Sequence, residues 1–411
     1  MYRRWFVFAL AAALFFLSQL YRTSNAVLAP RLLEDLALDT KGLGLLSASF
    51  FYAFAVTQIP ISLLLDKLGP RSIMTTLSLI GVLGAIIFSQ AEALSSGLAG
   101  RILLGAGMAC NLMGAYKLLT LWFGPRVFAT LAGILVAIGT VGNMVATTPL
   151  VILVENMGWR RGFLLIAAVN LLLTILFFAV VRNKPRQNPA APLSSEESLS
   201  LRQALANIKL LFRLKDYWII SIATGVRYGT YAAFQALWAG PFLLEAMGYS
   251  PVRAGNVILL LNIGFIAGSP IWGAAADNLF QSCKWLVVIG LLALAAVTAL
   301  ISLIPPTVSF ALVALLFFFF GFAGSAGLVM YPHIKNLVPE KMAGAAMTGI
   351  NFFTMVGPAI LLQGLGSLMQ RLYPESSRGP EAFKAAFLLC TACLIIVVIL
   401  YLFTKTKRAA P

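Results

Sequence analysis

Apolar runs long enough to cross a lipid bilayer recur from one end of this chain to the other. A helix needs about 20 mostly apolar residues to cross the hydrocarbon core, and its backbone is then satisfied internally. The runs predict an all-α membrane protein with twelve transmembrane helices, at 5–33, 43–65, 72–92, 97–121, 126–153, 160–182, 217–246, 252–276, 285–304, 307–331, 342–370 and 382–403.

The composition agrees with a chain that resides in lipid. Of its 411 residues, 60% are hydrophobic and only 11% are charged, whereas soluble domains are about a quarter charged. The first apolar run is too long for a cleaved signal peptide and lacks a small-residue cleavage site, so we expect none. Cys390 and Cys393 lie in an apolar run and are expected to be buried thiols. We predict no metal site and no cofactor.

The net charge of +16 is mainly a signal of topology. Most lysines and arginines fall in the segments that lie on the same side as both termini, and this side faces the cytoplasm by the positive-inside rule. The chain is therefore predicted to be integral to a membrane, with a bacterial inner membrane as the expected location. Its predicted partners are the lipid bilayer and a small anionic substrate, and no nucleic acid.

Four basic residues fall within the predicted spans, namely Arg22, Arg101, Lys117 and Arg227. A guanidinium at bilayer depth is costly and cannot lose its proton to escape that cost. All 14 acidic residues lie outside the middle of the spans. At least some of these cations therefore have no carboxylate at their own depth.

A polar segment near the centre divides the chain into two six-helix halves. The predicted parts are an N-terminal half at 1–182, a cytoplasmic linker at 183–215 and a C-terminal half at 216–411. Within the linker, apolar residues recur at helical spacing from Leu201 to Phe212, with basic residues elsewhere on the wheel. This pattern fits an amphipathic helix on the inner leaflet or a plain solvated linker helix.

Two pairs of residues suggest that the halves are pseudo-symmetric repeats. Asp66 and Asp277 follow the second span of each half, and Arg22 and Arg227 lie in the first span of each half. The two pairs are separated by nearly the same number of residues, as in transporters built from parallel repeats. We therefore expect Arg22 and Arg227 to face each other near the midplane.

Three motifs resemble those of the major facilitator superfamily. Ser62-x3-Asp66-Lys67-Leu68-Gly69-Pro70-Arg71 is similar to its signature between spans 2 and 3, Arg101-x3-Gly105-x-Gly107 to its span 4 motif, and the run Gly158 to Phe163 to a sequence common at the start of span 6. The resemblance implies the major facilitator fold and a cytoplasmic latch. The expected gating residues are Asp66, Lys67, Gly69, Arg71 and Arg101. The alternatives are a turn with topogenic charges and, for Arg101, a structural role.

Spans 1 and 7 resemble the organophosphate:phosphate antiporter and organic anion transporter branch of that superfamily. The similarity lies in Tyr21 to Pro30 and Val226 to Leu243, and it implies that Arg22 and Arg227 form a paired anion clamp. Two forked cations suit a carboxylate or phosphate; the alternative is that each only fixes packing. Histidine-assisted phosphate binding is typical of that branch, but the only histidine here is His333. The substrate-binding residues that we predict are Arg22, Arg227, Asn25, Tyr21, Tyr231, Lys117, Tyr52, Gln235, Trp238 and Asn351. The alternative for Lys117 is a side chain that extends to the membrane surface, and for the uncharged polar residues it is a hydrogen bond between helices.

These observations predict a secondary transporter that moves a small organic anion, a carboxylate or phosphate ester, by alternating access. A proton-coupled exporter of drugs or metabolites is the nearest alternative, although such exporters usually use an embedded carboxylate. A transporter-like receptor is another alternative. An enzyme is not expected, because acid–base chemistry lacks its usual residues. We expect a monomer, with a proton or sodium as the coupling ion.

Overall fold

The computed structural model describes residues 3–123, 125–183, 210–278 and 283–406. These residues form helices and short connections, and there is no strand among them. The chain divides into two compact units, Met1–Ala191 and Pro192–Pro411. Most of the amphipathic helix expected from Leu201 to Phe212 lies outside the described residues.

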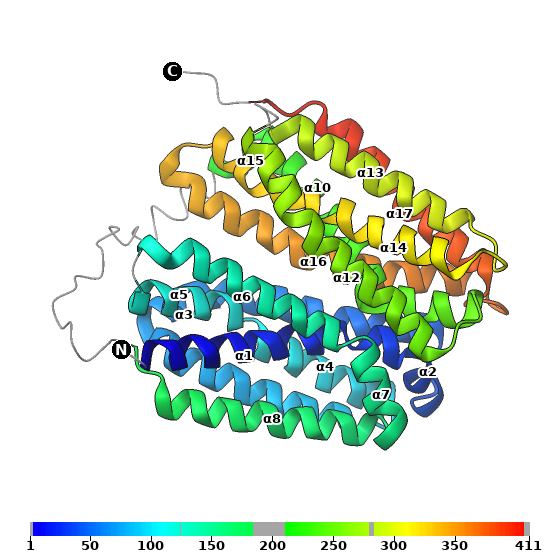
Figure 1. Ribbon diagram of the computed structural model, residues 1–411, viewed down its shortest axis with the longest axis horizontal. Coiled ribbons are helices and arrows are strands. Elements are labelled where there is room, and N and C mark those ends of the chain that lie inside the picture. The colour runs from blue at the N-terminus through cyan, green and yellow to red at the C-terminus, as the bar shows by residue number, and fades with distance from the viewer. Residues whose placement is uncertain (1–2, 124, 184–209, 279–282, 407–411) are drawn as a thin grey trace. The chain divides into compact units, whose positions relative to one another are not determined.

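The described residues of the N-terminal unit form eight helical segments (blue to green in Figure 1). In Figure 1, α1 lies between α6 and α8, and it packs on both. The segment α3 holds two spans that meet at Gly69, where a positive φ of 77° breaks the helix. The helices are α1 (Arg3–Thr23), α2 (Asn25–Asp35), α3 (Thr40–Ser89), α4 (Leu94–Met108), α5 (Asn111–Phe123), α6 (Pro125–Val145), α7 (Thr148–Met157) and α8 (Trp159–Val180).

The C-terminal unit (green to red in Figure 1) is also helical where it is described, with π-helical turns η1 and η2 and a 3₁₀ turn η3. Its segments are α10 (Lys215–Ala233), η1 (Phe234–Trp238), α11 (Ala239–Pro241), η2 (Phe242–Ala246), α12 (Pro251–Asn278), α13 (Cys283–Leu303), α14 (Phe310–Ser325), η3 (Ala326–Val329), α15 (Met330–Leu337), α16 (Glu340–Leu372) and α17 (Pro380–Tyr401).

The predicted twelve-helix fold class is confirmed. Among the described residues, ten helices are long and apolar enough to cross a membrane, and the bent pair Thr130–Val145 and Thr148–Met157 makes an eleventh span. The run from α10 through η2 occupies the position of the remaining span, span 7, which is divided by the π turns η1 and η2. Large apolar side chains on the outer helices remain exposed, such as Leu172 at 57% and Ile396 at 56%, as lipid-facing residues do.

The two halves use the same helix pairings. Span 1 packs on span 5 through α1 and α6, and span 7 packs on span 11 through α10 and α16. Spans 4 and 10 pack on α3 and α12, and the last spans, α8 and α17, pack on α3 and α13. This correspondence is what a parallel repeat of six helices requires.

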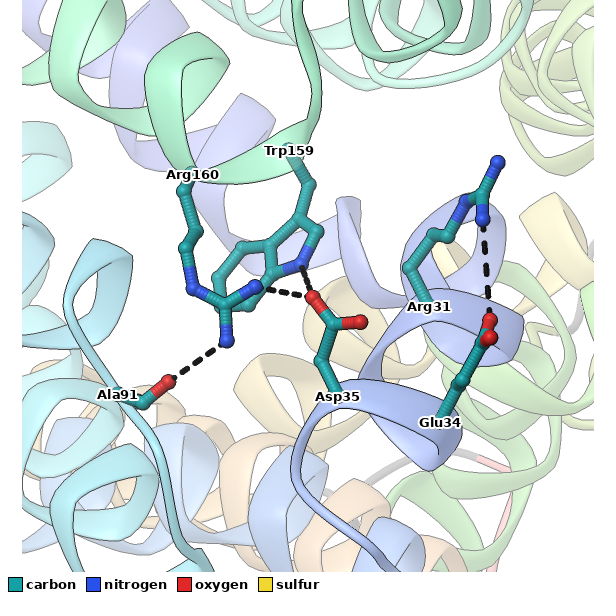
Figure 2. Close-up of polar contacts among 6 residues, drawn as sticks. All are labelled: Arg31, Glu34, Asp35, Ala91, Trp159 and Arg160. Carbon is teal, nitrogen blue, oxygen red and sulfur yellow. Dashed lines mark hydrogen bonds and ion pairs between the residues drawn. The ribbon is translucent and has the colours of Figure 1, made fainter.

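An ion-pair cluster at the end of α2 holds three segments of the N-terminal half together (Figure 2). Asp35 accepts hydrogen bonds from Trp159 Nε1, at 2.8 Å, and from Arg160 Nη1. The other terminal nitrogen of Arg160 donates to the carbonyl of Ala91, at 3.0 Å, and its guanidinium lies 4.5 Å from the centre of the Trp159 ring. We call Asp35, Trp159, Arg160 and Ala91 the Asp35 cluster. It joins the ends of spans 1 and 3 to the start of span 6.

The C-terminal half has a similar ion pair at the corresponding place. Glu245, near the end of span 7, accepts a hydrogen bond of 3.0 Å from Arg378, which precedes span 12. In each half an acid at the end of the first span thus pairs with an arginine near the start of the sixth. The sequence motifs did not predict this second point of correspondence between the repeats.

The Asp35 cluster makes the N-terminal half sensitive to acid. The hydrogen bond from Trp159, followed by that from Arg160, holds the pKa of Asp35 below its ordinary value of 3.8, against the opposing effect of partial burial. A carboxyl group with a depressed folded pKa contributes stability that is present above the unfolded pKa. That contribution is lost as the pH falls through the folded pKa.

We predict that Asp35→Ala lowers the melting temperature of the purified protein by a few degrees at pH 7. The substitution removes two hydrogen bonds and leaves the Trp159 N–H buried without its acceptor. Because the Asp35–Arg160 pair is partly exposed to solvent, we expect the loss of stability to be only about 1–2 kcal/mol. The difference from wild type should shrink as the pH falls below about 4. Thermal unfolding at both pH values measures this.

The matched control for that experiment is Glu34→Ala in the same helix (Figure 2). Glu34 pairs with Arg31 at 3.7 Å, but both side chains are more than 60% exposed. Such pairs are worth little, so this variant should melt close to wild type at both pH values. Equal melting temperatures for the two variants would contradict the assigned role of the Asp35 cluster.

Candidate functional site

Five of the described spans have an irregular segment within their length. Span 1 breaks at Ser24, span 4 at Ala109–Cys110 and span 5 at Ala146–Thr147, while span 7 contains the π turns η1 and η2 and span 10 contains η3. Four of the five are the first and fourth spans of each half. Broken helices in equivalent positions of a repeat mark the binding region in many transporters, because they leave backbone groups available within the membrane.

In the N-terminal half, side chains from spans 1 and 4 satisfy the carbonyl groups near each other's breaks. The carbonyl of Tyr21 accepts hydrogen bonds from Arg101 Nη1, at 2.9 Å, and from Ser24 Oγ, at 3.0 Å. Ser18 Oγ donates to the carbonyl of Met108, the last residue of α4, at 3.3 Å. A carbonyl group near the break in span 1, and one near the break in span 4, therefore accepts a hydrogen bond from a side chain of the other span.

Arg101 is fully buried inside the N-terminal half. Its guanidinium lies 5.0 Å from the centre of the Phe50 ring and 5.6 Å from that of Phe88. Gly105, one turn further along α4, brings span 4 against span 2, since a Cβ there would lie 2.2 Å from the carbonyl oxygen of Phe50. These contacts favour the structural alternative for Arg101, which caps the break in span 1.

Arg22 lies two residues before the break in span 1 and is 9% exposed. It donates to Gln19 Oε1, one turn earlier in the same helix. A guanidinium has five N–H donors, and this is its one hydrogen bond among the described residues. Close by, Thr23 Oγ1 donates to Asn143 Oδ1 of span 5, at 3.4 Å. The region combines a cation with amide and hydroxyl groups.

Arg227 is the corresponding cation of the C-terminal half, and it lies along span 10. Its Nη1 donates to the carbonyl of Gly324 at 3.0 Å, and within the described structure its buried Nε has no hydrogen-bond partner. The guanidinium lies over Gly327, where an added Cβ would be 2.0 Å from Nε. Like Arg22, it keeps N–H donors beyond those used within its own half.

Sequence reasoning missed Tyr331, a half-buried residue of α15 near Arg227. Its hydroxyl donates to Asn351 Oδ1 at 3.0 Å and lies 3.2 Å from Thr354 Oγ1, both in span 11. The Arg227 guanidinium lies 5.4 Å from the centre of the Tyr228 ring. The break at η3 could have drawn attention to Tyr331, which follows it by two residues.

The other predicted substrate-binding residues differ in exposure. Tyr21, Asn25 and Trp238 are fully buried; Asn25 Nδ2 donates to Ser47 Oγ at 2.8 Å, and Trp238 Nε1 to the carbonyl of Leu362 at 3.3 Å. Gln235, also buried, donates to Tyr231 and Asn262. Each of these contacts joins two residues of the same half. Two further candidates are half-buried, Tyr52 and Lys117.

The predicted gating segment docks on the end of span 6. Arg71 donates to the carbonyl of Phe178 from Nε and Nη2, at 3.0 and 2.8 Å, and lies over the Phe178 ring at 4.2 Å. The backbone N–H of Arg71 also donates to Asn183 Oδ1, at 2.9 Å. Asn183 fits because Gly69 has no Cβ, which would lie 2.4 Å from Asn183 Nδ2. Lys67 is exposed.

Two acidic residues of the predicted latches cannot be placed in these contacts. The side chains of Asp66 and Asp277 lie outside the described part of the structure. The pairing predicted for Asp66 therefore stays a prediction. In this segment the Arg71 side chain caps the C-terminal end of α8.

The single histidine, His333, holds the C-terminal segment. It is buried, with Nδ1 2.7 Å from the hydroxyl of Tyr401 and Nε2 2.9 Å from the carbonyl of Lys405. Lys284 Nζ donates to the carbonyls of Leu402 and Thr404 nearby. Both ring nitrogens of His333 thus form hydrogen bonds with the segment that ends the described part of the C-terminal half.

Comparison with known protein families settles the identity of the fold. The family model described as Major Facilitator Superfamily matches residues 10–360 and 220–411. The chain belongs to the major facilitator superfamily. This is a family of transporters, so the prediction that the chain is a membrane transporter and not an enzyme is confirmed.

Several curated relatives are named for organic acids. The chain is 22% identical to the "Probable sulfoacetate transporter SauU" of Cupriavidus necator, over 68% of this chain and 66% of that protein. It is 22% identical to the "Probable galactarate/D-glucarate transporter GarP" of Escherichia coli, over 94% and 91%. It is 24% identical to the "Hexuronate transporter" of Bacillus subtilis, over 84% of each.

Solved structures share the fold at low sequence identity. A bacterial homologue of the human lysosomal transporter Spinster matches with a TM-score of 0.80 and 18% identity, covering 100% of this chain and 99% of that one. The nucleoside transporter NupG, as its D323A mutant, matches with a TM-score of 0.78 and 15% identity, over 97% and 100%. These matches establish the fold alone.

We predict that Gly105→Ala destabilises the protein by about 1–3 kcal/mol or more, because the new methyl group would meet the Phe50 backbone. Gly133→Ala in α6 is the control, since no atom lies within 4 Å of its added Cβ. Thermal unfolding in detergent should separate the two variants clearly. A Gly105→Ala protein that melts with the control would contradict the observed close packing of spans 2 and 4.

Proposed function

We propose that this transporter moves a small organic anion, a carboxylate or a phosphate ester, and that Arg22 and Arg227 bind it. The observation that carries the proposal is a matched pair of cations. The middle of the first span of each half holds one arginine, and each of these arginines has N–H donors without a hydrogen-bond partner among the described residues of its own half. An anion with two or more acceptor oxygens fits such donors.

The chemistry of the guanidinium supports this substrate class. Its planar fork matches a carboxylate or a phosphate in a bidentate pair. Each arginine alone is an expensive charge at bilayer depth, and an anion held between two arginines would compensate both. The names of the relatives point the same way, because sulfoacetate, galactarate, glucarate and hexuronate are all organic acids.

The acidic residues argue against the nearest alternative, a proton-coupled exporter. Such a carrier usually places a carboxylate within the membrane. In the described spans, Asp35, Glu155 and Glu245 lie at the ends of their segments. Coupling would then use an exchanged anion, a co-transported proton or sodium ion, or a proton carried on the substrate.

The remaining features of the proposal concern gating and location. The two halves would rock around the bound anion, and the segment from Asp66 to Arg71 would act as a latch at the cytoplasmic end of the N-terminal half. Arg71 supports this role because it already fastens that segment to span 6. The distribution of basic residues supports cytoplasmic termini, and a bacterial inner membrane and a monomeric state complete the proposal.

We predict that Arg22→Ala and Arg227→Ala each weaken anion binding by about 30- to 4,000-fold. Removal of one partner from a desolvated, hydrogen-bonded charge pair costs about 2–5 kcal/mol, and each 1.4 kcal/mol is about tenfold in affinity. Arg22→Lys should also fail, because an ammonium group cannot make the forked contact. Calorimetric titration with tartrate, succinate and glycerol 3-phosphate measures these affinities.

Arg31→Ala provides the control, since Arg31 follows Arg22 in span 1 but has an exposed side chain. It should bind anions like wild type, and circular dichroism should show that all variants remain folded. Folded Arg22→Ala and Arg227→Ala proteins with near-normal affinity would return both arginines to a purely structural role.

A further inference from the structure

Gln19 lies one turn before Arg22 in span 1, and the two side chains are bonded to each other. Residues three apart are neighbours on one side of a helix, and Arg22 Nη2 donates a hydrogen bond to Gln19 Oε1. Both residues precede the break at Ser24. This contact adds a carboxamide group, which the sequence motifs do not single out, to the cation of the candidate site.

The bond to Arg22 determines how the carboxamide group of Gln19 is oriented. A guanidinium can only donate hydrogen bonds, so Gln19 must face it with its oxygen and direct its NH₂ group elsewhere. Among the residues that the structure describes, Gln19 Nε2 has no hydrogen-bond acceptor. Because Gln19 is half-buried and not enclosed, its amide donors are open to a ligand.

The Arg22 guanidinium keeps one complete edge for an anion while it is bonded to Gln19. A guanidinium has two edges of paired N–H donors that suit a carboxylate, Nε with Nη2 and Nη1 with Nη2. The two protons of Nη2 belong to different edges. A single bond from Nη2 to Gln19 therefore leaves the other edge intact, and that edge can hold both oxygens of a carboxylate.

Span 5 holds this part of span 1 in place. A Cβ on Gly142 would lie 2.3 Å from the carbonyl oxygen of Phe16 and 3.2 Å from Cβ of Gln19, so the two helices are close at this point. Asn143 Oδ1 lies 3.4 Å from the hydroxyl oxygen of Thr23, which in turn lies 3.0 Å from the carbonyl oxygen of Gln19. The backbone that carries Gln19 is therefore supported by span 5.

We propose that Gln19 is a further substrate-contacting residue, and that its amide N–H groups bind an oxygen of the substrate next to the carboxylate held by Arg22. This inference rests on the proposed function, in which Arg22 binds that carboxylate. Because the paired contact with Arg22 uses both oxygens of the carboxylate, the Gln19 donors are left for a further acceptor, such as a hydroxyl group. The site then selects hydroxy acids over acids of the same length without hydroxyl groups.

Tartrate and succinate test the inference, because they share a carbon skeleton and two carboxylates and differ only in two hydroxyl groups. Wild type should bind the preferred enantiomer of tartrate about 3- to 10-fold more tightly than succinate, as expected for one hydrogen bond. Gln19→Met keeps an unbranched side chain but removes the amide group, so its two affinities should come within about twofold of each other. Calorimetric titration of each acid measures this ratio.

Gln19→Glu separates the two contacts of the side chain. A glutamate keeps an oxygen that accepts from Arg22, but when ionised it has no N–H donor for a ligand. It should therefore lose the preference for tartrate, as Gln19→Met does. Its added charge should weaken the binding of both acids, and this effect cancels in the ratio because both ligands are dianions.

Gln90→Met is the matched control, since it makes the same change at an exposed glutamine that follows α3 in the same half. It should keep the wild-type preference for tartrate. Circular dichroism should show that the variants remain folded, and either folded Gln19 variant tests the inference without the other.

The possible outcomes distinguish this inference from the function on which it rests. Equal affinities for the two acids in wild type, or a preference for tartrate that persists in a folded Gln19 variant, overturn the inference, while Arg22→Ala can still show that the clamp is correct. Persistence together with a parallel loss of both affinities would leave Gln19 only the task of fixing Arg22. Failure of wild type to bind tartrate, succinate and glycerol 3-phosphate overturns the proposed function and this inference together.

Discussion

Within a membrane, every carbonyl released by a break in a helix needs a donor from inside the bundle. This requirement links the irregular spans of this transporter. Arg101 and Ser24 satisfy the carbonyl of Tyr21 before the break in span 1, and Arg227 satisfies that of Gly324 before the 3₁₀ turn in span 10. The breaks, the buried cations and the close glycine contacts are therefore parts of one arrangement in each half.

The same chemistry separates three arginines that look alike in the sequence. Arg101 is enclosed by aromatic rings and bonded to a backbone carbonyl, so its contacts account for it as a structural cap. Arg22 makes a single bond to a neighbour in its own helix. Arg227 shares features of both, because it caps a carbonyl and retains a buried Nε without a partner in the described structure. Arg101 also has a buried Nε and Nη2 without a partner in the described structure, so unused donors alone do not separate the three arginines; the enclosing rings of Phe50 and Phe88 set Arg101 apart.

Ion pairs and hydrogen bonds at the ends of the spans also hold each half together. The Asp35 cluster and the Glu245–Arg378 pair join the first and sixth spans of their halves. Arg71 joins the segment between spans 2 and 3 to the opposite end of span 6. Each half is thereby fastened internally, which suits the rocking of two rigid bodies that alternating access requires.

The sequence determined the features that depend on local composition. Apolar runs of sufficient length predicted the helices, because the thickness of the bilayer fixes how many apolar residues a span needs. The breaks could not be predicted in the same way, since Ser24 and Ala326 lie within apolar runs and their turns depend on donors from other spans.

The candidate site shows the same division. The sequence singled out Arg22 and Arg227, because a guanidinium among apolar residues is conspicuous without any knowledge of the fold. It could not show that Asn25 and Trp238 are fully buried, that Arg101 caps a carbonyl of span 1, or that Tyr331 bonds to Asn351. Those facts depend on contacts between residues far apart in the chain, which only the packing of the helices creates.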